Sequence, residues 1–269
     1  MRRARFIITT ILFILLYLAV FPRLFREWFE TDDYSHGFLI PLISIYFLWR
    51  KRAELKNTPV SGSAGGIFFI AAGLILYILA KTGSQFFLQA CSMLIVLFGL
   101  VYAQAGPSIA KKTAFSIAYL IFMIPLPQLV YTTITFHLGL FSTKLTYFLI
   151  RALGISAARE GNIIDLPTCR LIVATPCSGL RSLIVFMAAS LAIGYIFQKS
   201  IAKRALLFGI GIALAVLMNT LRLTVTAFIA NMLKLKAIPP VVHDRTGIAV
   251  VILGFILLFL INDFLAKRK

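Results

Sequence analysis

Long uninterrupted apolar runs constrain this chain more than any other feature of its sequence. Apolar residues fill 60% of the 269 positions, charged residues fill only 13%, and the mean hydropathy is +0.95. Soluble domains are about 45–50% apolar and about 25% charged, so this composition excludes a water-soluble domain. About 20 apolar residues cross a bilayer core as a helix, which satisfies every backbone hydrogen bond within one segment. The sequence therefore predicts an all-α integral membrane protein.

We expect eight transmembrane helices in one polytopic membrane domain, residues 1–269. The expected spans are residues 6–22, 36–50, 64–80, 86–104, 113–133, 178–197, 205–228 and 247–265. Segment 134–152 is apolar but carries His137, Lys144 and Arg151, so we expect it to be interfacial or re-entrant. The first apolar run is similar to a signal peptide, but no Ala-x-Ala-like cleavage site follows it. We expect it to remain as the first span.

The distribution of charge predicts the orientation of these helices. If 134–152 does not cross, both termini share one side of the membrane, and that side receives fifteen of the 27 basic residues. These are Arg2, Arg3, Arg5, Arg50, Lys51, Arg52, Lys56, Lys111, Lys112, Lys199, Lys203, Arg204, Lys267, Arg268 and Lys269. Seven of the nine acidic residues fall on the other side, namely Glu27, Glu30, Asp32, Asp33, Glu160, Asp165 and Asp244. Basic residues concentrate in cytoplasmic loops, so the net charge of +18 indicates topology and requires no nucleic-acid partner.

This orientation places residues 153–177 and 229–246 outside the cytoplasm. Within the first of these segments, residues 162–166 and 170–174 are rich in Ile, Leu and Val, and Pro167 lies between them. Short runs of this kind, separated by a turn residue, are typical of a β-hairpin. We expect a short extracytoplasmic hairpin that lies on the membrane surface.

The most distinctive polar stretch is Ala174-Thr-Pro-Cys-Ser-Gly-Leu-Arg-Ser-Leu183, just before an apolar run. Cys177 would stand at the beginning of a helix, with Ser178 as a candidate N-cap and Arg181 one turn later. The positive end of a helix and a nearby arginine both lower the pKa of a thiol and increase its thiolate fraction. Cys177 is therefore a candidate nucleophile, and the alternative is an inert buried cysteine.

Arg222 lies inside the apolar run 205–228, one helical turn after Asn219. Arginine keeps its charge, so at that depth it needs a partner, a water-filled cavity or a path to the outer interface along which it can snorkel. In a catalytic site it would be a fixed donor to an oxyanion.

His243 precedes the last span on the same outer face, and Asp244 is a candidate to orient its ring. An imidazole exchanges protons near neutral pH, as acid–base catalysis requires. His36 and His137 are also expected outside, so topology alone does not choose among the three histidines.

The three cysteines, Cys91, Cys169 and Cys177, have neither zinc-ligand nor redox-motif spacing. No metal or organic cofactor is expected. A redox pair of Cys169 and Cys177 is an alternative, but such a disulfide would block the proposed nucleophile.

Five motifs, in order along the chain, resemble those of the exosortase/archaeosortase family of membrane cysteine transpeptidases. They are Asp33-Tyr-Ser-His-Gly37, Pro125-Leu-Pro127, Cys177-Ser-Gly-Leu-Arg-Ser-Leu183, Asn219-Thr-Leu-Arg222 and His243-Asp-Arg-Thr-Gly247. The resemblance implies a catalytic triad of Cys177, Arg222 and His243. The residues expected to bind substrate or support the triad are Arg181, Asn219, Asp244, His36 and Ser178.

The resemblance also implies a class of substrate and a location. The substrates would be exported proteins whose C-terminal sorting signal combines a Pro-Glu-Pro-like motif, one hydrophobic helix and a basic tail. Cleavage would pass through a thioester on Cys177, resolved by water in a protease or by an amine or hydroxyl in a transpeptidase. The expected location is the bacterial inner membrane, with the active site at the periplasmic face and lipids as the only other partner.

A non-enzymatic transporter or exopolysaccharide-export component is the main alternative, with Arg222 and Asn219 lining a polar path. Many transporters carry paired interrupted helices in corresponding halves of the chain. The sequence shows no such symmetry.

Overall fold

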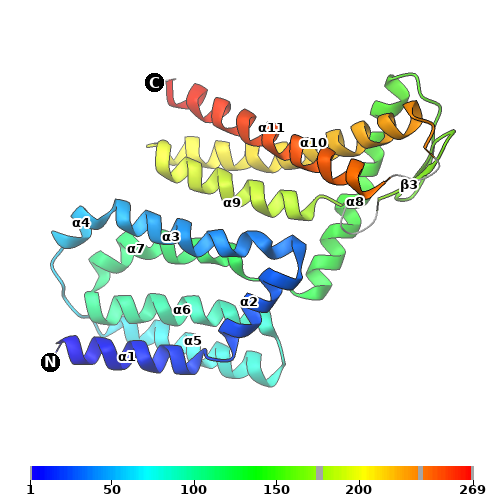
Figure 1. Ribbon diagram of the computed structural model, residues 1–269. Coiled ribbons are helices and arrows are strands. Elements are labelled where there is room, and N and C mark those ends of the chain that lie inside the picture. The colour runs from blue at the N-terminus through cyan, green and yellow to red at the C-terminus, as the bar shows by residue number, and fades with distance from the viewer. Residues whose placement is uncertain (1, 174–177, 236–238, 268–269) are drawn as a thin grey trace. The chain divides into compact units, whose positions relative to one another are not determined.

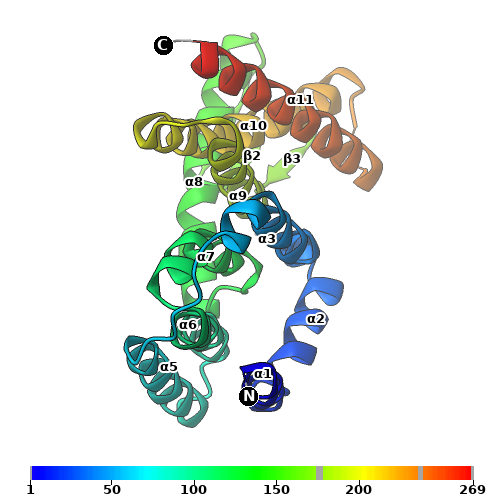
Figure 2. The same cartoon turned by 90° about the vertical axis from the view of Figure 1, so that its left-hand side faces the viewer.

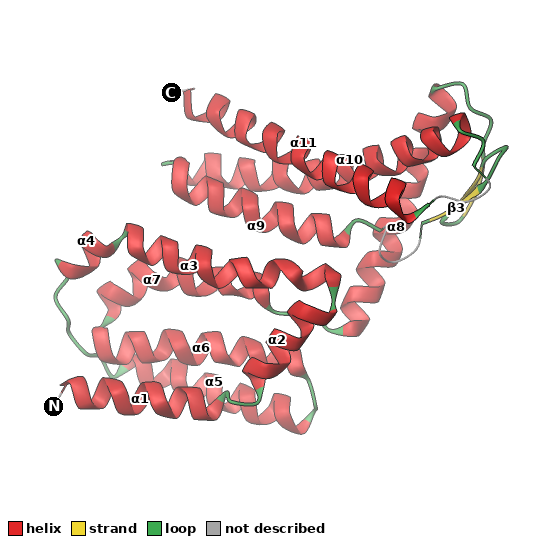
Figure 3. Ribbon diagram, in the orientation of Figure 1, coloured by secondary structure: helices red, strands yellow, loops and turns green. Residues whose placement is uncertain are grey.

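The computed structural model describes residues 2–173, 178–235 and 239–267, and for residues 2–3 and 240–244 it describes the backbone alone. Helices dominate throughout (Figure 3). The chain separates into two compact units, Met1–Pro127 and Gln128–Lys269.

The first unit is helical throughout its regular structure (Figure 1). Its elements are α1 (Arg2–Leu16), α2 (Val20–Glu30), the 3₁₀ helix η1 (Asp32–Phe38), α3 (Leu39–Arg50), α4 (Arg52–Lys56), α5 (Gly65–Thr82), α6 (Phe86–Ala105), α7 (Pro107–Tyr119) and the 3₁₀ helix η2 (Leu120–Met123). In Figures 1 and 2, α5 runs antiparallel beside α6.

Glycines allow α5 and α6 to approach closely. A Cβ atom at Gly66 would overlap the backbone of Ala103, and one at Gly99 would lie 2.8 Å from the amide nitrogen of Ile70. Helices in lipid associate largely through such close packing, because the surrounding acyl chains are as apolar as the side chains. The pair is therefore held by contacts that any larger side chain at these positions would remove.

Prolines explain where the expected first and fifth spans are interrupted. The helix expected at 6–22 is a bent pair, in which α1 and α2 meet at 58°. Pro22 has no amide hydrogen to donate to the carbonyl of Leu18, and its ring clashes with that carbonyl. The helix expected at 113–133 ends as α7 and η2, and a new helix begins at Gln128, directly after Pro125 and Pro127.

The prediction of eight spans is not confirmed. Among the described residues, five helices are long and apolar enough to cross a membrane: Gly65–Thr82, Phe86–Ala105, Leu180–Phe197, Ile201–Met232 and Arg245–Lys267. Two bent pairs, Ala4–Leu16 with Val20–Glu30 and Pro107–Met123 with Gln128–Ala152, raise the number to seven if each is one span. The expected span 36–50 is only the twelve residues of α3, because a 3₁₀ turn occupies its first part.

The second unit begins with α8 (Gln128–Ala152), which runs without a break through the segment expected to be separate and interfacial. Its buried face is a stripe of small and polar residues: Thr135, Gly139, Ser142, Thr143 and Thr146. The apolar Ile150 completes this face near the end of the helix. The polar residues that argued against a span, His137, Lys144 and Arg151, are exposed. They share the helix with the buried stripe because they lie on other faces.

The expected hairpin is a three-stranded antiparallel sheet, formed by β1 (Ala158–Glu160), β2 (Ile163–Asp165) and β3 (Arg170–Ile172) in that order. The two expected strands are β2 and β3. Strand β1 has no apolar side chain larger than alanine, so its sequence carries no strand pattern. Ile164 and Leu171 pack the sheet against Ile150 of α8 and Ala227 of α10 (Ile201–Met232).

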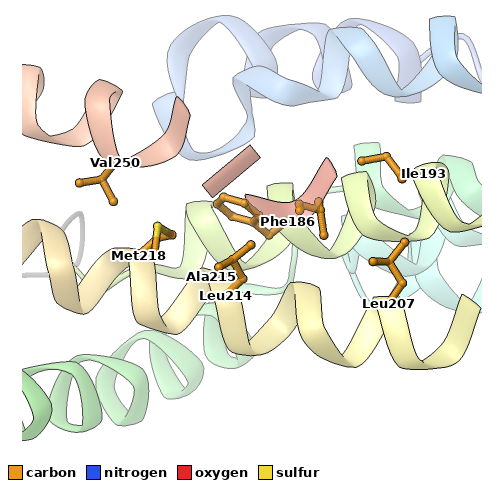
Figure 4. Packing of buried hydrophobic residues seen from close by; sticks show 8 residues of the cluster. Phe186, Ile193, Leu207, Leu214, Ala215, Met218 and Val250 are labelled. Carbon is orange, nitrogen blue, oxygen red and sulfur yellow. The ribbon is translucent and has the colours of Figure 1, made fainter. Parts of the chain in front are cut away.

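Three long helices complete the second unit: α9 (Leu180–Phe197), α10 (Ile201–Met232) and α11 (Pro240–Lys267). They pack side by side around Phe186, Met218 and Leu258, as Figure 4 shows for the first two residues. At one end, the Gln198 amide nitrogen donates hydrogen bonds to the side-chain and backbone oxygens of Asn262, at 2.8 and 2.9 Å. This fixes the end of α9 to α11.

We predict that Gly66→Ala destabilises the protein by about 2 kcal/mol, because the new methyl group forces α5 away from the backbone of α6. The same substitution at Gly209 in α10 is the matched control, since no atom would lie within 4 Å of its Cβ. Gly209→Ala should be neutral or stabilise the helix by up to about 1 kcal/mol. Thermal unfolding in detergent, followed by circular dichroism, measures both. Equal melting temperatures would contradict the importance of this contact.

Candidate active site

The side-chain amide of Asn219 joins three segments of the second unit. Its nitrogen donates one hydrogen bond to the Ser142 hydroxyl on α8 and another to the backbone carbonyl of Ser178, just before α9, both at 3.2 Å. Asn219 is 3% exposed, so both bonds form away from water. Buried polar groups in lipid must find partners within the protein, which makes this amide a fixed junction.

Gly179 fits against this junction for two reasons. Its φ of 95° lies in the left-handed region, which glycine adopts without steric cost. A Cβ there would also lie 2.7 Å from the Asn219 side-chain carbon Cγ. Gly179, and not Ser178, is therefore the N-cap of α9, which corrects the sequence-based assignment. The Ser178 hydroxyl instead accepts a 3.4 Å hydrogen bond from the amide of Leu180.

Arg222 follows Asn219 by three residues, so both lie on one face of α10. A Cβ at Gly247 in α11 would be 3.6 Å from Cδ of Arg222 and 3.8 Å from Nη1. The arginine thus lies against a part of α11 that has no side chain. One turn further, the hydroxyls of Thr226 and Thr246 are 3.0 Å apart and tie the same two helices together.

The length of α10 indicates how deep Arg222 lies. Its 32 residues extend about 48 Å, which exceeds the roughly 30 Å hydrocarbon core, so the helix projects beyond that core. Arg222 is ten residues before the helix ends at Met232, about 15 Å along the axis. The sheet packs beside the same end, through Ala227 and Ala230. The arginine therefore lies toward the end of α10 that carries the sheet.

The other predicted site residues differ in how much of each the structure describes. Cys177 lies outside the described residues. His243 and Asp244 lie in the first turns of α11, and His243 is one turn before Gly247, but their side chains are outside what is described. Arg181 is exposed in the first turn of α9.

His36 belongs to the first unit, where its Nε2 atom is 3.2 Å from the carbonyl oxygen of Phe122. Cys169 is a free thiol buried beneath the sheet. Among the described residues, no group of three His, Cys, Asp or Glu side chains could hold a metal ion.

Sequence reasoning missed the contributions of Ser142, Thr226 and Thr246. A signal for the first was present, because Ser142 belongs to the small and polar stripe of α8, whose residues recur at helical spacing. The two threonines give no signal by themselves, since their contact depends on how α10 and α11 pack.

The comparisons give one match. A family model described as transmembrane exosortase matches residues 28–260, from α2 into α11. No curated protein and no solved structure matches the chain. The matched range contains Asn219 and Arg222. It also contains the residues that lie against them, namely Ser142, Ser178, Gly179 and Gly247.

We predict that Asn219→Asp destabilises the second unit by about 3 kcal/mol, because it buries a charge and turns a carboxylate oxygen toward the Ser178 carbonyl, which can only accept. Asp has nearly the shape of Asn, so packing is preserved. Thr220→Ser is the control: Thr220 is also buried, and its hydroxyl donates to the Val216 carbonyl of its own helix. Thermal unfolding in detergent compares the two, and an unchanged midpoint for Asn219→Asp would disprove the role of the amide.

Proposed function

The chain belongs to the transmembrane exosortase family, and on this premise we propose that it is a multi-pass membrane cysteine transpeptidase. Its substrates are exported proteins that carry a C-terminal sorting signal: a Pro-Glu-Pro-like motif, a hydrophobic helix and a basic tail. The catalytic residues are Cys177, Arg222 and His243. The enzyme acts at the periplasmic face of the bacterial inner membrane.

One observation carries this proposal: the face of α10 that bears Arg222 is hydrogen-bonded through Asn219 to Ser178, just before α9, and contacts α11 at Gly247. Asn219, one turn before Arg222, holds the carbonyl of Ser178, which is the residue after Cys177. Gly247, against which Arg222 lies, is one turn after His243 in α11. The chain neighbours of all three proposed residues therefore meet around one face of α10.

The chemistry proceeds through an acyl-enzyme. The Cys177 thiolate attacks the scissile carbonyl carbon, and the carbonyl electron pair moves onto oxygen, where the Arg222 guanidinium stabilises the negative charge. Collapse of this intermediate reforms the carbonyl and breaks the carbon–nitrogen bond, and His243 donates a proton to the departing amine. A thioester on Cys177 remains. An acceptor amine, hydroxyl or water then attacks the thioester and gives its proton to the neutral His243, and the thiolate leaves.

An arginine at position 222 suits this role physically. Its charge persists at any pH that the protein meets, and its planar fork can donate two parallel hydrogen bonds. Because Gly247 has no side chain, α11 leaves space beside the guanidinium. Asn219 fixes the helix face from which the arginine extends.

The transporter alternative finds less support. Two interrupted helices occur in the described chain, at the α1–α2 bend and at the α7–α8 break. The second break coincides with the boundary between the units at Pro127, which is not equivalent to the first break near the N-terminus. Interrupted helices at corresponding positions of two repeats would be expected of a transporter.

We predict that Cys177→Ala abolishes cleavage of a co-expressed protein bearing a sorting signal, because no other group supplies the nucleophile. The variant should accumulate in the membrane at the level of the unmodified protein, as measured by immunoblot beside the cleavage product. Cys91→Ala, which changes a thiol in α6 of the first unit, is the matched control and should cleave normally. Normal cleavage by Cys177→Ala would eliminate the mechanism.

We predict that Arg222→Lys lowers the cleavage rate about a hundredfold or more, close to the loss in Arg222→Ala. An ammonium group keeps the charge but cannot reproduce the guanidinium fork at the oxyanion. Arg204→Lys makes the same change near the other end of α10, where the guanidinium donates to the Gln198 carbonyl at 2.9 Å, and should leave the rate unchanged. If Arg222→Lys retained full activity, Arg222 would act only by snorkelling to the interface.

A further inference from the structure

A cavity of about 820 Å³ opens in the first unit between α1 and α6. It is lined mainly by apolar side chains, among them Phe6, Phe13, Leu97 and Leu100. Cavities of this size hold drug-sized or larger apolar ligands. It belongs to no part of the proposed active site, so what binds there is a separate question from the proposed function.

Two polar contacts join α1 to α6. The Gln104 amide nitrogen donates to the Thr9 hydroxyl at 2.9 Å, and the Tyr17 and Ser92 hydroxyls are 3.1 Å apart. Thr9 lies in α1 and Tyr17 is the residue after its last turn, eight positions later and about 12 Å further along. These two hydrogen bonds join the segments at separate points, and the cavity lies between α1 and α6 near the first of them.

The polar lining gathers at one end of this cavity. Arg5 lies one turn before Thr9, whose hydroxyl also donates to the Arg5 carbonyl at 2.9 Å. The Arg5 side chain is exposed, and no carboxylate of the described residues forms an ion pair with it. A guanidinium presents five donors and no acceptor, and the Gln104 amide adds another donor. This end therefore favours an anion.

The other end continues into apolar space. A second cavity, of about 350 Å³, shares Phe13 and Leu97 with the first and is lined further along by Trp28 and Met123. Its lining is almost wholly apolar. The two cavities together follow α6 from a cationic end to an aromatic, apolar end. This arrangement is complementary to an amphiphile that has an anionic head and an apolar tail.

We propose that these cavities bind an anionic phospholipid, with its phosphate at Arg5 and Gln104 and an acyl chain extending past Phe13 and Leu97. Basic pockets between helices on the cytoplasmic side bind anionic lipid head groups, and the distribution of charge in the sequence predicts that Arg5 lies on that side. The basic tail of a sorting signal would instead be repelled by Arg5. Its helix, about 10–12 Å wide, also needs more room than a single acyl chain.

Binding of palmitoyl-oleoyl phosphatidylglycerol to the delipidated full-length protein in detergent, measured by native mass spectrometry, tests the proposal. Phosphatidylcholine with the same acyl chains is the comparison lipid. Phosphatidylglycerol should bind at least about fivefold more tightly, and Arg5→Gln should remove most of that difference. Lys56→Gln, which neutralises an exposed lysine of the same unit, should not change either affinity.

The acyl-chain part of the site has its own variant. Leu97→Trp places a large ring where the two cavities adjoin and should weaken both lipids alike, whereas Ile78→Trp, on the exposed face of α5, should weaken neither. Melting temperatures without lipid verify that each variant is folded. Equal affinities for the two lipids, an Arg5→Gln variant that binds like the unmodified protein, or displacement of bound phosphatidylglycerol by a peptide carrying a sorting helix would each overturn the proposal.

Discussion

The hydrogen bonds of one buried amide organise the second unit. In lipid, a polar side chain without a partner costs several kcal/mol, so an asparagine in the middle of a helix is stable only where other segments supply acceptors. Asn219 meets this condition with Ser142 on one side and the Ser178 carbonyl on the other. Close contact with Gly179 then determines the backbone path into α9. The position of α8, the start of α9 and the orientation of α10 are thereby coupled, and the environment of Arg222 depends on all three.

This coupling explains why small residues recur around the candidate site. Gly139, Gly179 and Gly247 lie where α8, α9 and α11 approach α10 or its neighbours, and the buried face of α8 is built from threonine and serine. Between membrane helices, small side chains permit close approach and hydroxyls bond across the interface. One of them, Gly247, lies next to Arg222, whose charge cannot be neutralised. The small residues at these positions therefore allow both the close packing of the helices and the placement of Arg222 among them.

Composition and the length of the apolar runs predicted the helical membrane class and α5, α6, α9, α10 and α11, because an apolar run of bilayer length has few other stable structures. The ends of other helices were not predictable from hydropathy, because an apolar stretch keeps the same hydropathy whether or not the helix is interrupted within it. Pro125 and Pro127 stand in an apolar stretch, and only their missing amide hydrogens separate α7 from α8. The extent of α8 was not predictable for a related reason: composition averages over faces, whereas burial depends on which face each residue occupies. The interfacial or re-entrant placement of 134–152 stays a prediction.

The sequence alone marks the residues of the candidate site, but not the residues that support them. Arg222 and Asn219 were conspicuous as polar residues in an apolar run, and the motifs around Cys177 and His243 were recognisable by resemblance. Ser142 contacts Asn219 from 77 positions away, so its role depends on packing that no local pattern encodes. The left-handed conformation of Gly179 likewise became apparent only beside the asparagine that it contacts.

The small sheet has one further consequence, for the protein's neighbours in a crowded membrane. Strand β1 is an open edge whose backbone groups could pair with a strand of another molecule. Its three residues are all exposed, and two of them, Arg159 and Glu160, are charged. A short, charged edge is a poor template for intermolecular pairing, since a second strand would have to bring its own side chains against both charges. The β1 edge can thus remain exposed without recruiting other copies into a growing ribbon.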